Sequence, residues 1–381
     1  MHITGIICEY NPLHLGHKKQ LDTVRAKFPE GGIVCLMSGN YVQRGKPAIV
    51  DKSVRAKAAI LSGADLVLEL PVTAALSSAE GFAAEGVRIL SSFCNSLCFG
   101  SETGDQDLLM AAAKVLLSPA FSEALRKELE AGVSFPVARQ KALAAMGICD
   151  DILSRPNDIL AVEYCKAILA QNVPMQPMPI LRGGSYHDLL ADSENPSATA
   201  VRELMLCSGA WLDYVPETAR DCFINASLHT LEAGERAVLA RLRTMTDAEF
   251  EALPYGSEGL WRKLMHAARQ ENTLEDILTA TKSKRYTRTR LDRMVMCAFL
   301  GLTALDLASP APYIRVLALN DQGRQILKEA RKYGSFVNAG EAVDSPYQAI
   351  ETRTGDLYGL FATDAPEAPG QEATRRVYYQ K

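Results

Sequence analysis

The sequence lacks any apolar run long enough to cross a lipid bilayer. Runs such as Ala64 to Leu70 fall far short of the ~20 residues that a spanning helix needs. Residues Met1 to Cys8 also lack a basic start followed by a long apolar stretch, so no secretory signal is visible. With 48% apolar and 23% charged residues, the composition is typical of a folded globular protein. We therefore expect a cytoplasmic protein without a membrane partner.

A disulfide framework and an excess of basic charge are lacking as well. The nine cysteines are an odd number in apolar segments, which is typical of buried thiols in a reducing compartment. Cys94 and Cys98 are the closest pair, but no second pair with metal-ligand spacing accompanies them, so we predict no metal site there. The formal net charge of −4 excludes a globally basic coat for nucleic acid, although it permits a local basic patch.

The pattern of apolar runs predicts an α/β fold with a parallel sheet. Five short runs bounded by Gly, Pro, Asn or Ser have the character of buried parallel strands. They are Ile3 to Cys8, Gly32 to Met37, Ala64 to Leu70, Ser96 to Phe99 and Met178 to Leu181. Helix-length segments separate most of them. Because ligands of such sheets collect at the carboxyl ends of the strands, the loops at residues 9–17, 38–46 and 100–104 are the places to look for a site.

The length of 381 residues favours two packed units over one. From about residue 200 strand-like runs largely disappear, and helical periodicity dominates to about residue 335. We predict an α/β domain over residues 1–205 and a mainly helical domain over residues 206–381, with a short terminal strand at Val377 to Tyr379.

The sharpest motif follows the first predicted strand and ends in His14-Leu15-Gly16-His17. Gly16 permits close approach of a ligand, and the helix that begins here offers free N–H groups to phosphate oxygens. The two imidazoles can donate hydrogen bonds to charge that builds on a phosphate under attack. Two other interpretations are a structural turn at Asn11-Pro12 and a zinc site, but the histidines lack the companions of a zinc motif.

A second cluster contains Ser197, Thr199 and Arg202. The hydroxyls and free N–H groups at a helix start can hold phosphate oxygens, and Arg202 adds positive charge. Plain helix capping explains the serine and threonine equally well without a ligand. Together with the histidine motif, however, the cluster resembles the HxGH nucleotidyltransferases (HUP-like), which carry a second Ser/Thr/Lys/Arg motif after the last strand of the sheet.

Several longer motifs, in order, resemble the bacterial tRNA(Met) cytidine acetate ligase family. They are Glu9 to His17, Met37 to Gly45, Gly63 to Pro71, Phe99 to Glu102, Pro156-Asn157 and Tyr186-His187-Asp188. The similarity spans the first ~200 residues and continues more weakly into Glu258 to Leu260 and Thr281 to Arg293. The resemblance implies a ligase that forms N4-acetylcytidine at the wobble position of elongator tRNA(Met) from acetate and ATP, through an acetyl-adenylate.

The resemblance also implies which residues act. His14 and His17 would be catalytic, and Gly100, Asn157 and Arg182 would contact ATP together with the first loop. That loop comprises Ile7, Cys8, Glu9, Tyr10, Asn11, Pro12, Leu13, His14, Leu15, Gly16, His17, Lys18, Lys19 and Gln20. Structural roles are the alternative, because Gly100 can end a strand, Asn157 can cap a helix that begins near Ile159, and Arg182 can be a solvated charge.

ATP is expected as a substrate, with Mg²⁺ bridging its phosphates and no protein ligand for the ion that can be named. Five polar residues are candidates for contacts to acetate, triphosphate or cytidine: Asn40, Gln43, Arg44, Lys52 and Arg55. Two other functions stay open. One is transfer of a nucleotide to a small phosphate-bearing metabolite, and the other is RNA binding without catalysis.

The segment from Thr281 to Arg293 carries six basic residues against one acid, namely Lys282, Lys284, Arg285, Arg288, Arg290 and Arg293. Such a run neutralises phosphates, and Tyr286 can stack on an unpaired base. Arginine–carboxylate pairs within the domain are the alternative explanation. We predict a tRNA-binding surface here, in the helical domain and apart from the adenylation site.

Overall fold

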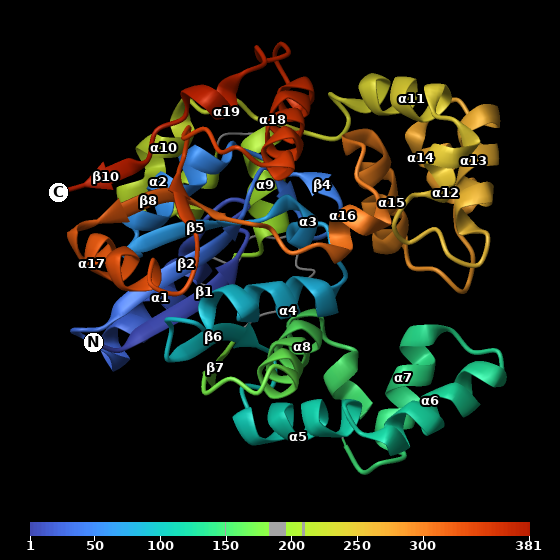
Figure 1. The fold of residues 1–381 in the computed structure, drawn as a ribbon, viewed down its shortest axis with the longest axis horizontal. Helices are drawn as coiled ribbons and strands as arrows, with labels where there is room; N and C mark the ends of the chain where they lie inside the picture. The colour runs from blue at the N-terminus through green and yellow to red at the C-terminus, as the bar shows by residue number, and fades with distance from the viewer. Residues whose placement is uncertain (149, 183–195, 208–209) are drawn as a thin grey trace.

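The structure is a computed structural model that describes residues 1–148, 150–182, 196–207 and 210–381. Its centre is a sheet with the strand order β10-β8-β5-β2-β1-β6-β7, with β9 beside β8 (Figure 1). The strands are β1 Ile3–Cys8, β2 Gly32–Ser38, β5 Leu66–Leu70, β6 Ser96–Ser101, β7 Gln176–Leu181, β8 Ile314–Asn320, β9 Phe336–Asn338 and β10 Tyr378–Gln380. A separate hairpin pairs β3 Tyr41–Val42 with β4 Lys46–Pro47. The prediction of a parallel α/β sheet is confirmed, and all five expected strands are present.

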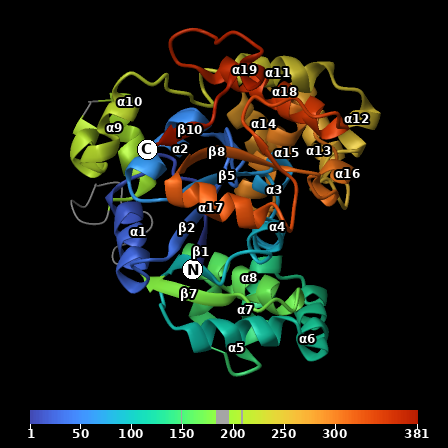
Figure 2. The same ribbon diagram turned by 60° about the vertical axis from the view of Figure 1, so that its left-hand side comes forward.

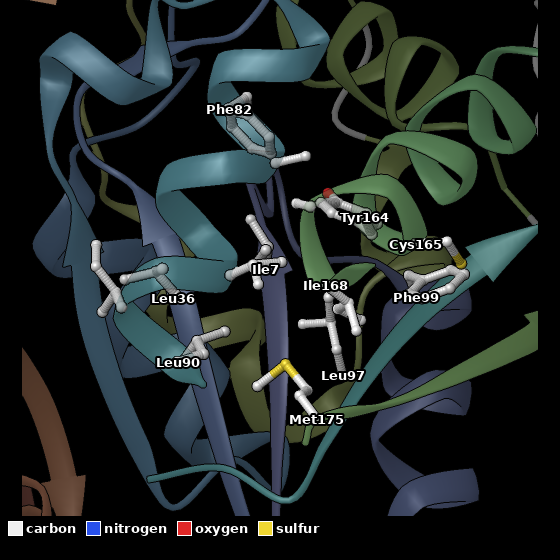
Figure 3. Packing of buried hydrophobic residues seen from close by; sticks show 14 of the residues in the cluster. Ile7, Leu36, Phe82, Leu90, Leu97, Phe99, Tyr164, Cys165, Ile168 and Met175 are labelled. Carbon is white, nitrogen blue, oxygen red and sulfur yellow. The ribbon is translucent and has the colours of Figure 1, made fainter. Parts of the chain in front are cut away.

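Helices cover both faces of the sheet, because side chains along each strand alternate between two cores. On one face Ile7, Leu36 and Leu97 pack against α4 and α8 (Figure 3). On the other face Ile6 and Cys35 pack against α1, α2 and α9. The covering helices are α1 Leu15–Lys27, α2 Lys52–Leu61, α3 Val72–Ala75, α4 Ala79–Leu90, α8 Pro156–Ala170, α9 Ala198–Cys207, α10 Arg220–Ile224 and α17 Asp321–Ala330.

Two helical lobes extend from the sheet, one below it and one to its right in Figures 1 and 2. The lower lobe contains α5 Gln106–Leu116, α6 Pro119–Glu130 and α7 Phe135–Ala144. The other has its own apolar core and contains α11 Glu235–Thr244, α12 Asp247–Glu251, α13 Leu260–Gln270, α14 Leu274–Thr281, α15 Arg288–Leu300 and α16 Ala304–Ala308. The remaining helices are α18 Pro346–Tyr358, α19 Gln371–Thr374 and the short 3₁₀ turns Asp150–Leu153, Ala210–Tyr214, Glu217–Ala219 and Gly359–Phe361.

The last third of the chain returns to the sheet, which the sequence pattern did not predict. β8 pairs antiparallel with β5, and β9 and β10 both pair parallel with β8. Residues 206–381 therefore supply a helical lobe and also three strands of the central sheet. The expected terminal strand is β10, shifted by one residue to Tyr378–Gln380. The division at residue 205 stays a prediction, and these strands tie the two parts together.

The connections of the sheet reverse direction beside β1. From β1 the chain moves outward to β2 and β5, and it then returns to form β6 and β7 on the other side of β1. Such a switch point leaves a crevice outside the carboxyl ends of β1 and β6, where ligands of open α/β sheets bind. The loop at residues 9–17 and the end of β6 lie at this crevice.

Within the described ranges no single helix is both long and apolar enough to span a membrane. The bent pair α5 and α6 meets that test by length and composition alone.

Candidate active site

A cavity of about 620 Å³ lies at the switch point of the sheet, and most of the predicted site residues line it. This volume falls within the range usual for sites that enclose a small-molecule ligand. The predicted residues in its wall are Ile7, Cys8, Glu9, Tyr10, Asn11, His14, Gly16, His17, Lys19, Gln20, Gly100, Asn157, Arg182, Ser197, Thr199 and Arg202. A larger, more open cavity of about 1300 Å³ beside α17 contains none of these residues.

Four residues of the predicted loop lie outside the cavity wall. Leu13 is fully buried in the core beneath the loop. Lys18 pairs with Asp22 one turn along α1. Pro12 and Leu15 are likewise absent from the lining. Contact of these four residues with ATP stays a prediction that the cavity wall does not support.

His14 and His17 lie side by side at the start of α1, with ring centroids 3.8 Å apart. His14 is the N-cap residue, and its Nδ1 accepts a hydrogen bond from the N–H of Gly16 at 3.1 Å. The N–H of His14 donates to Nδ1 of His17 at 3.3 Å, which completes a capping box. A Cβ on residue 16 would lie 3.0 Å from the His14 ring, so glycine permits this packing.

These hydrogen bonds and the burial of the rings set the chemistry of the pair. Burial, Arg182 and Arg202 lower the pKa of His14 to about 3, and burial, His14 and Arg182 lower the pKa of His17 well below its ordinary value. Both rings are therefore neutral at pH 7. Since Nδ1 of each ring accepts a hydrogen bond, the proton of each neutral ring is on Nε2. The pair thus presents two uncharged N–H donors, each carried by a fixed ring.

The second predicted cluster lies directly against the histidine loop. Ser197 caps α9, because its Oγ accepts a hydrogen bond from the N–H of Ala200 at 3.0 Å. The Arg202 guanidinium donates to the main-chain oxygen of Asn11 at 2.6 Å and to the Thr199 hydroxyl at 3.0 Å. The start of α9 and the start of α1 therefore form adjacent parts of one wall. Asn195, which precedes this cluster, lies outside the described residues.

Gly100, Asn157 and Arg182 also come together, although 82 positions of sequence separate the first from the last. A Cβ at residue 100 would lie 2.8 Å from Cδ of Arg182, so the glycine makes room for that side chain to cross β6. Arg182 donates to Oδ1 of Asn157 at 3.1 Å, and Nδ2 of Asn157 donates to Glu102 at 2.6 Å.

The expectation that Asn157 could cap a helix near Ile159 is wrong. Helix α8 begins at Pro156, and its N-cap residue is Arg155. The Glu102 carboxylate caps the start of this helix, because it accepts hydrogen bonds from the N–H groups of Asn157 and Asp158 at 3.2 and 2.7 Å. The amide of Asn157 is held between Glu102 and Arg182 at the cavity, and the capping role of Glu102 was not predicted.

Comparison with known proteins agrees with this geometry. Residues 1–371 match the HIGH Nucleotidyl Transferase family. The tRNA(Met) cytidine acetate ligase of Clostridium perfringens is 38% identical, over 87% of this chain and 88% of the relative. That of Acetivibrio thermocellus is 33% identical over 99% of each chain. This chain belongs to the tRNA(Met) cytidine acetate ligase family.

Solved structures extend the match to three dimensions. The apo crystal structure of Thermotoga maritima TmcAL superposes with a TM-score of 0.90 at 28% identity, over 100% of both chains. The same protein bound with alpha-thio ATP gives a TM-score of 0.88 at 28% identity. The resemblance drawn from the motifs is confirmed. Of those motifs, Tyr186-His187-Asp188 lies outside the described residues.

The five polar candidates of this family member separate into two groups. Gln43 and Arg44 line the cavity. Asn40, Lys52 and Arg55 do not, because their polar groups are engaged elsewhere. The Asn40 side chain donates to Asp51 and accepts from the Lys52 N–H. The Lys52 ammonium donates to Glu69 and Glu372. The buried Arg55 donates to four main-chain oxygens, those of Glu9, Ser38, Gly39 and Val50. These three side chains hold the scaffold, and their contacts with substrate stay a prediction that the structure does not support.

The basic segment of the ligase has mixed surroundings. Lys282, Lys284 and Arg285 are exposed, and Arg285 also pairs with Glu258 at 3.0 Å. Arg288 is paired with Glu275 and Asp292, and Arg290 donates to Tyr255 and Ser257. Carboxylate pairing therefore accounts for part of the run.

Arg293 lies apart from its neighbours in the basic segment. Its side chain is buried against the Tyr255 ring, and it lines the cavity together with Thr287 and Thr289. The expected separation of the basic segment from the adenylation site is therefore wrong. Helix α15 starts at the cavity because the β3–β4 hairpin packs on it, with Arg293 donating to the Gln43 carbonyl at 3.4 Å.

The wall of the cavity is strongly cationic. Besides the two histidines, its described residues include Lys19, Arg44, Lys46, Arg139, Arg182, Arg202 and Arg293, whereas Glu9 is the one carboxylate. Lys46 and Arg139 were not predicted, because neither lies in a recognisable motif. A wall with this charge suits a polyanionic ligand. It does not fit a magnesium site built from protein ligands, and no group of three or more His, Cys, Asp or Glu side chains is placed for a metal within the described part of the chain.

Proposed function

We propose that this chain joins acetate to the wobble cytidine of elongator tRNA(Met), with ATP consumed to AMP and pyrophosphate and N4-acetylcytidine as the product. The observation that carries the proposal is the neutral imidazole pair at the start of α1, near Arg182 and Arg202 in one cationic cavity. Membership of the tRNA(Met) cytidine acetate ligase family and the likeness to a homologue bound with alpha-thio ATP support it.

In the first step, ATP binds with its α-phosphate beside His14 and His17. An acetate oxygen attacks the α-phosphorus, the bond to the pyrophosphate oxygen breaks, and acetyl-adenylate forms. The Nε2–H groups of the two histidines donate to phosphate oxygens as negative charge builds on them. Because both rings are neutral donors in a buried site, they need no reorganisation at the moment of reaction.

The other phosphate contacts come from the neighbouring helix starts. We assign Arg182, held by Asn157, and Arg202, with Ser197 and Thr199 at the start of α9, to the phosphates. Gly100 leaves the space for this arrangement. Mg²⁺ would arrive with ATP, held by phosphate oxygens and water rather than by a protein cage.

In the second step, the exocyclic amine of the cytidine attacks the carbonyl carbon of acetyl-adenylate and AMP leaves. Acetate itself is a poor acyl donor, which is why activation by ATP precedes transfer. The tRNA would approach from the side of the cavity where Lys46, Thr287 and Thr289 lie, next to the exposed basic residues of the segment 282–285. We place the reaction in the cytoplasm, without a membrane partner.

The adenylation step can be tested without tRNA. Acetate-dependent exchange of labelled pyrophosphate into ATP reports formation of an enzyme-bound adenylate. We expect exchange with acetate and none without a carboxylic acid. Exchange that needs a phosphate-bearing metabolite instead of acetate would support transfer of the nucleotide itself and contradict the proposal.

A further inference from the structure

Glu9 is an unusual residue in its surroundings. It directly follows β1, and it is the one carboxylate among the described residues that line the cavity, where seven lysine and arginine side chains also lie. Adenylation gives this group no evident task. The attacking acetate is already an anion and has no proton to lose, and a second carboxylate near the phosphates would repel both reactants.

The scaffold fixes the position of Glu9 from two sides. Its Oε1 accepts a hydrogen bond from the N–H of Gln43 at 2.7 Å, and its main-chain oxygen accepts one from the buried Arg55 at 2.7 Å. The carbonyl of the same Gln43 accepts from Arg293 of α15. Glu9 therefore lies between the histidine loop and the side of the cavity that continues toward the basic segment.

The charged groups facing Glu9 come from several elements. Arg44 follows β3, Arg55 belongs to α2 and Arg202 belongs to α9, and all three favour the carboxylate form. The Tyr164 phenol on α8 is a further titratable group near it, and the Cys8 thiol precedes it at the end of β1. Burial outweighs the three arginines and the Gln43 N–H, so the pKa of Glu9 is raised above its ordinary value. A raised pKa makes a carboxylate a better proton acceptor near neutral pH.

The second step of the proposed function needs such an acceptor. When the cytidine amine attacks the acetyl carbonyl, its nitrogen becomes positively charged and must lose a proton. A carboxylate is also the side chain that recognises this amine, because it accepts a hydrogen bond from N4–H₂ of cytosine.

We infer that Glu9 is a catalytic residue of acyl transfer, accepting a hydrogen bond from N4 of the target cytidine and removing its proton. The N4 lone pair forms the C–N bond to the acetyl carbonyl. The C–O bond to the phosphate breaks, and its electron pair leaves with AMP. The proton passes from N4 to the Glu9 carboxylate and then to water. This role rests on the proposed function, and it assigns to Glu9 a step that His14 and His17 do not perform.

The test supplies chemically prepared acetyl-adenylate to excess enzyme with tRNA(Met), so that only transfer is measured, as label entering cytidine in a single turnover. Glu9→Gln is the decisive variant, because its amide oxygen still accepts from the Gln43 N–H. We expect transfer to slow by roughly 10²–10⁴-fold. The wild-type rate should fall on acidification as the Glu9 carboxylate takes up a proton, at a pH above that of an ordinary glutamate because its pKa is raised, and the variant should lack this dependence.

The outcomes separate the two claims. If the wild type transfers acetate and Glu9→Gln does so at the same rate with the same pH profile, Glu9 only positions the loop and the inference is overturned. A variant whose loss is confined to tRNA affinity, measured by filter binding, with a normal first-order rate at saturation, overturns it too. If the wild type itself transfers no acetyl group to the RNA, the proposed function fails and the role of Glu9 fails with it.

Discussion

His14 serves the fold and the site at once. Its ring caps α1 through Nδ1, the same hydrogen bond leaves the ring proton on Nε2, and the residue lines the cavity. Helix capping contributes typically about 1 kcal/mol, so removal of the ring has a structural cost that the sequence did not predict. His17 is the better probe of chemistry, because its Nδ1 accepts the N–H of His14, which precedes the helix, rather than an N–H of α1 itself.

We expect His14→Ala and His17→Ala each to slow acetyl-adenylate formation by roughly 10²–10³-fold, the usual effect of losing one donor to developing charge. Pyrophosphate exchange measures this rate. His266→Ala is the matched control, because that histidine is exposed on α13. Near-normal exchange in both active-site variants would show that the histidine pair does not act on the phosphate.

The histidine pair should also make stability depend on pH. The folded-state pKa of both rings lies below the value of an unfolded histidine, about 6.5, so below that pH the unfolded chain binds more protons and stability falls. Each ring contributes a slope of up to about 1.4 kcal/mol per pH unit. Urea unfolding at about pH 7.5 and pH 5.5 should show a smaller loss in the His14→Asn, His17→Asn double variant. Equal losses in variant and wild type would contradict buried neutral rings.

Asn157→Ala should weaken ATP binding by roughly tenfold, the scale of one charge-assisted hydrogen bond. The substitution removes the groups that hold Arg182 and contact Glu102, but it leaves the main-chain hydrogen bonds at the start of α8 in place. The shift in melting temperature that ATP induces measures the effect, with the exposed Gln325→Ala as control. An unchanged shift would assign Asn157 to the fold alone.

Among the elements, helix α19 and the residue after it are held against the start of α2 by buried ion pairs. Arg375 pairs with Asp51 and Glu372, and Lys52 pairs with Glu372 and Glu69. Burial alone would raise the pKa of Asp51, but the Arg375 guanidinium holds it below its ordinary range. The last residues of the chain thus support the helix that carries Arg55 and, through it, the end of β1.

Arg375→Met should destabilise the protein by about 3–5 kcal/mol, because it leaves buried carboxylates without their partner. Denaturant unfolding measures the loss. The neighbouring Arg376 is exposed, so Arg376→Met should change stability by no more than about 0.5 kcal/mol. Similar effects for the two substitutions would show that the pairs of Arg375 contribute little.

The elements around the site were predictable where their signals are local. Strand β1, its loop and α1 follow one another in sequence, and the motif marks their junction. The roles of Lys52 and Arg55 were not predictable, because a charged residue near a loop can face either a ligand or the scaffold. The partner that decides for Lys52 is Glu372, 320 positions away. Strand β8 was missed for a similar reason. It pairs with β5, which lies far earlier in the sequence, as the pair Leu68 and Val316 shows.

In the molecule as a whole, the cavity adjoins the basic segment, because Thr287, Thr289 and Arg293 line it. Replacing Lys282, Lys284 and Arg285 by Ala should weaken tRNA binding and reduce its salt dependence by roughly one unit of slope per lost phosphate contact. These residues are exposed and none lines the cavity. Adenylate formation without tRNA should therefore continue.

A matched control removes three exposed basic residues from α17 and its end, Arg324, Lys328 and Arg331; Figure 1 shows α17 on the opposite side of the molecule from α13 and α14. Filter binding over a range of salt concentrations compares the two triple variants. Equal losses from both would mean that tRNA responds only to total charge, and no loss from the first would place the tRNA surface elsewhere.

We expect one cationic cavity, lined by His14 and His17, to carry acetate to a cytidine of tRNA(Met). The most direct measurement incubates the protein with ATP, labelled acetate and total tRNA, then digests the RNA and identifies the labelled nucleoside. We expect label in N4-acetylcytidine from tRNA(Met) with the wild-type protein and almost none with His17→Ala. Label in no RNA, or equal label with both proteins, would contradict this function of the cavity.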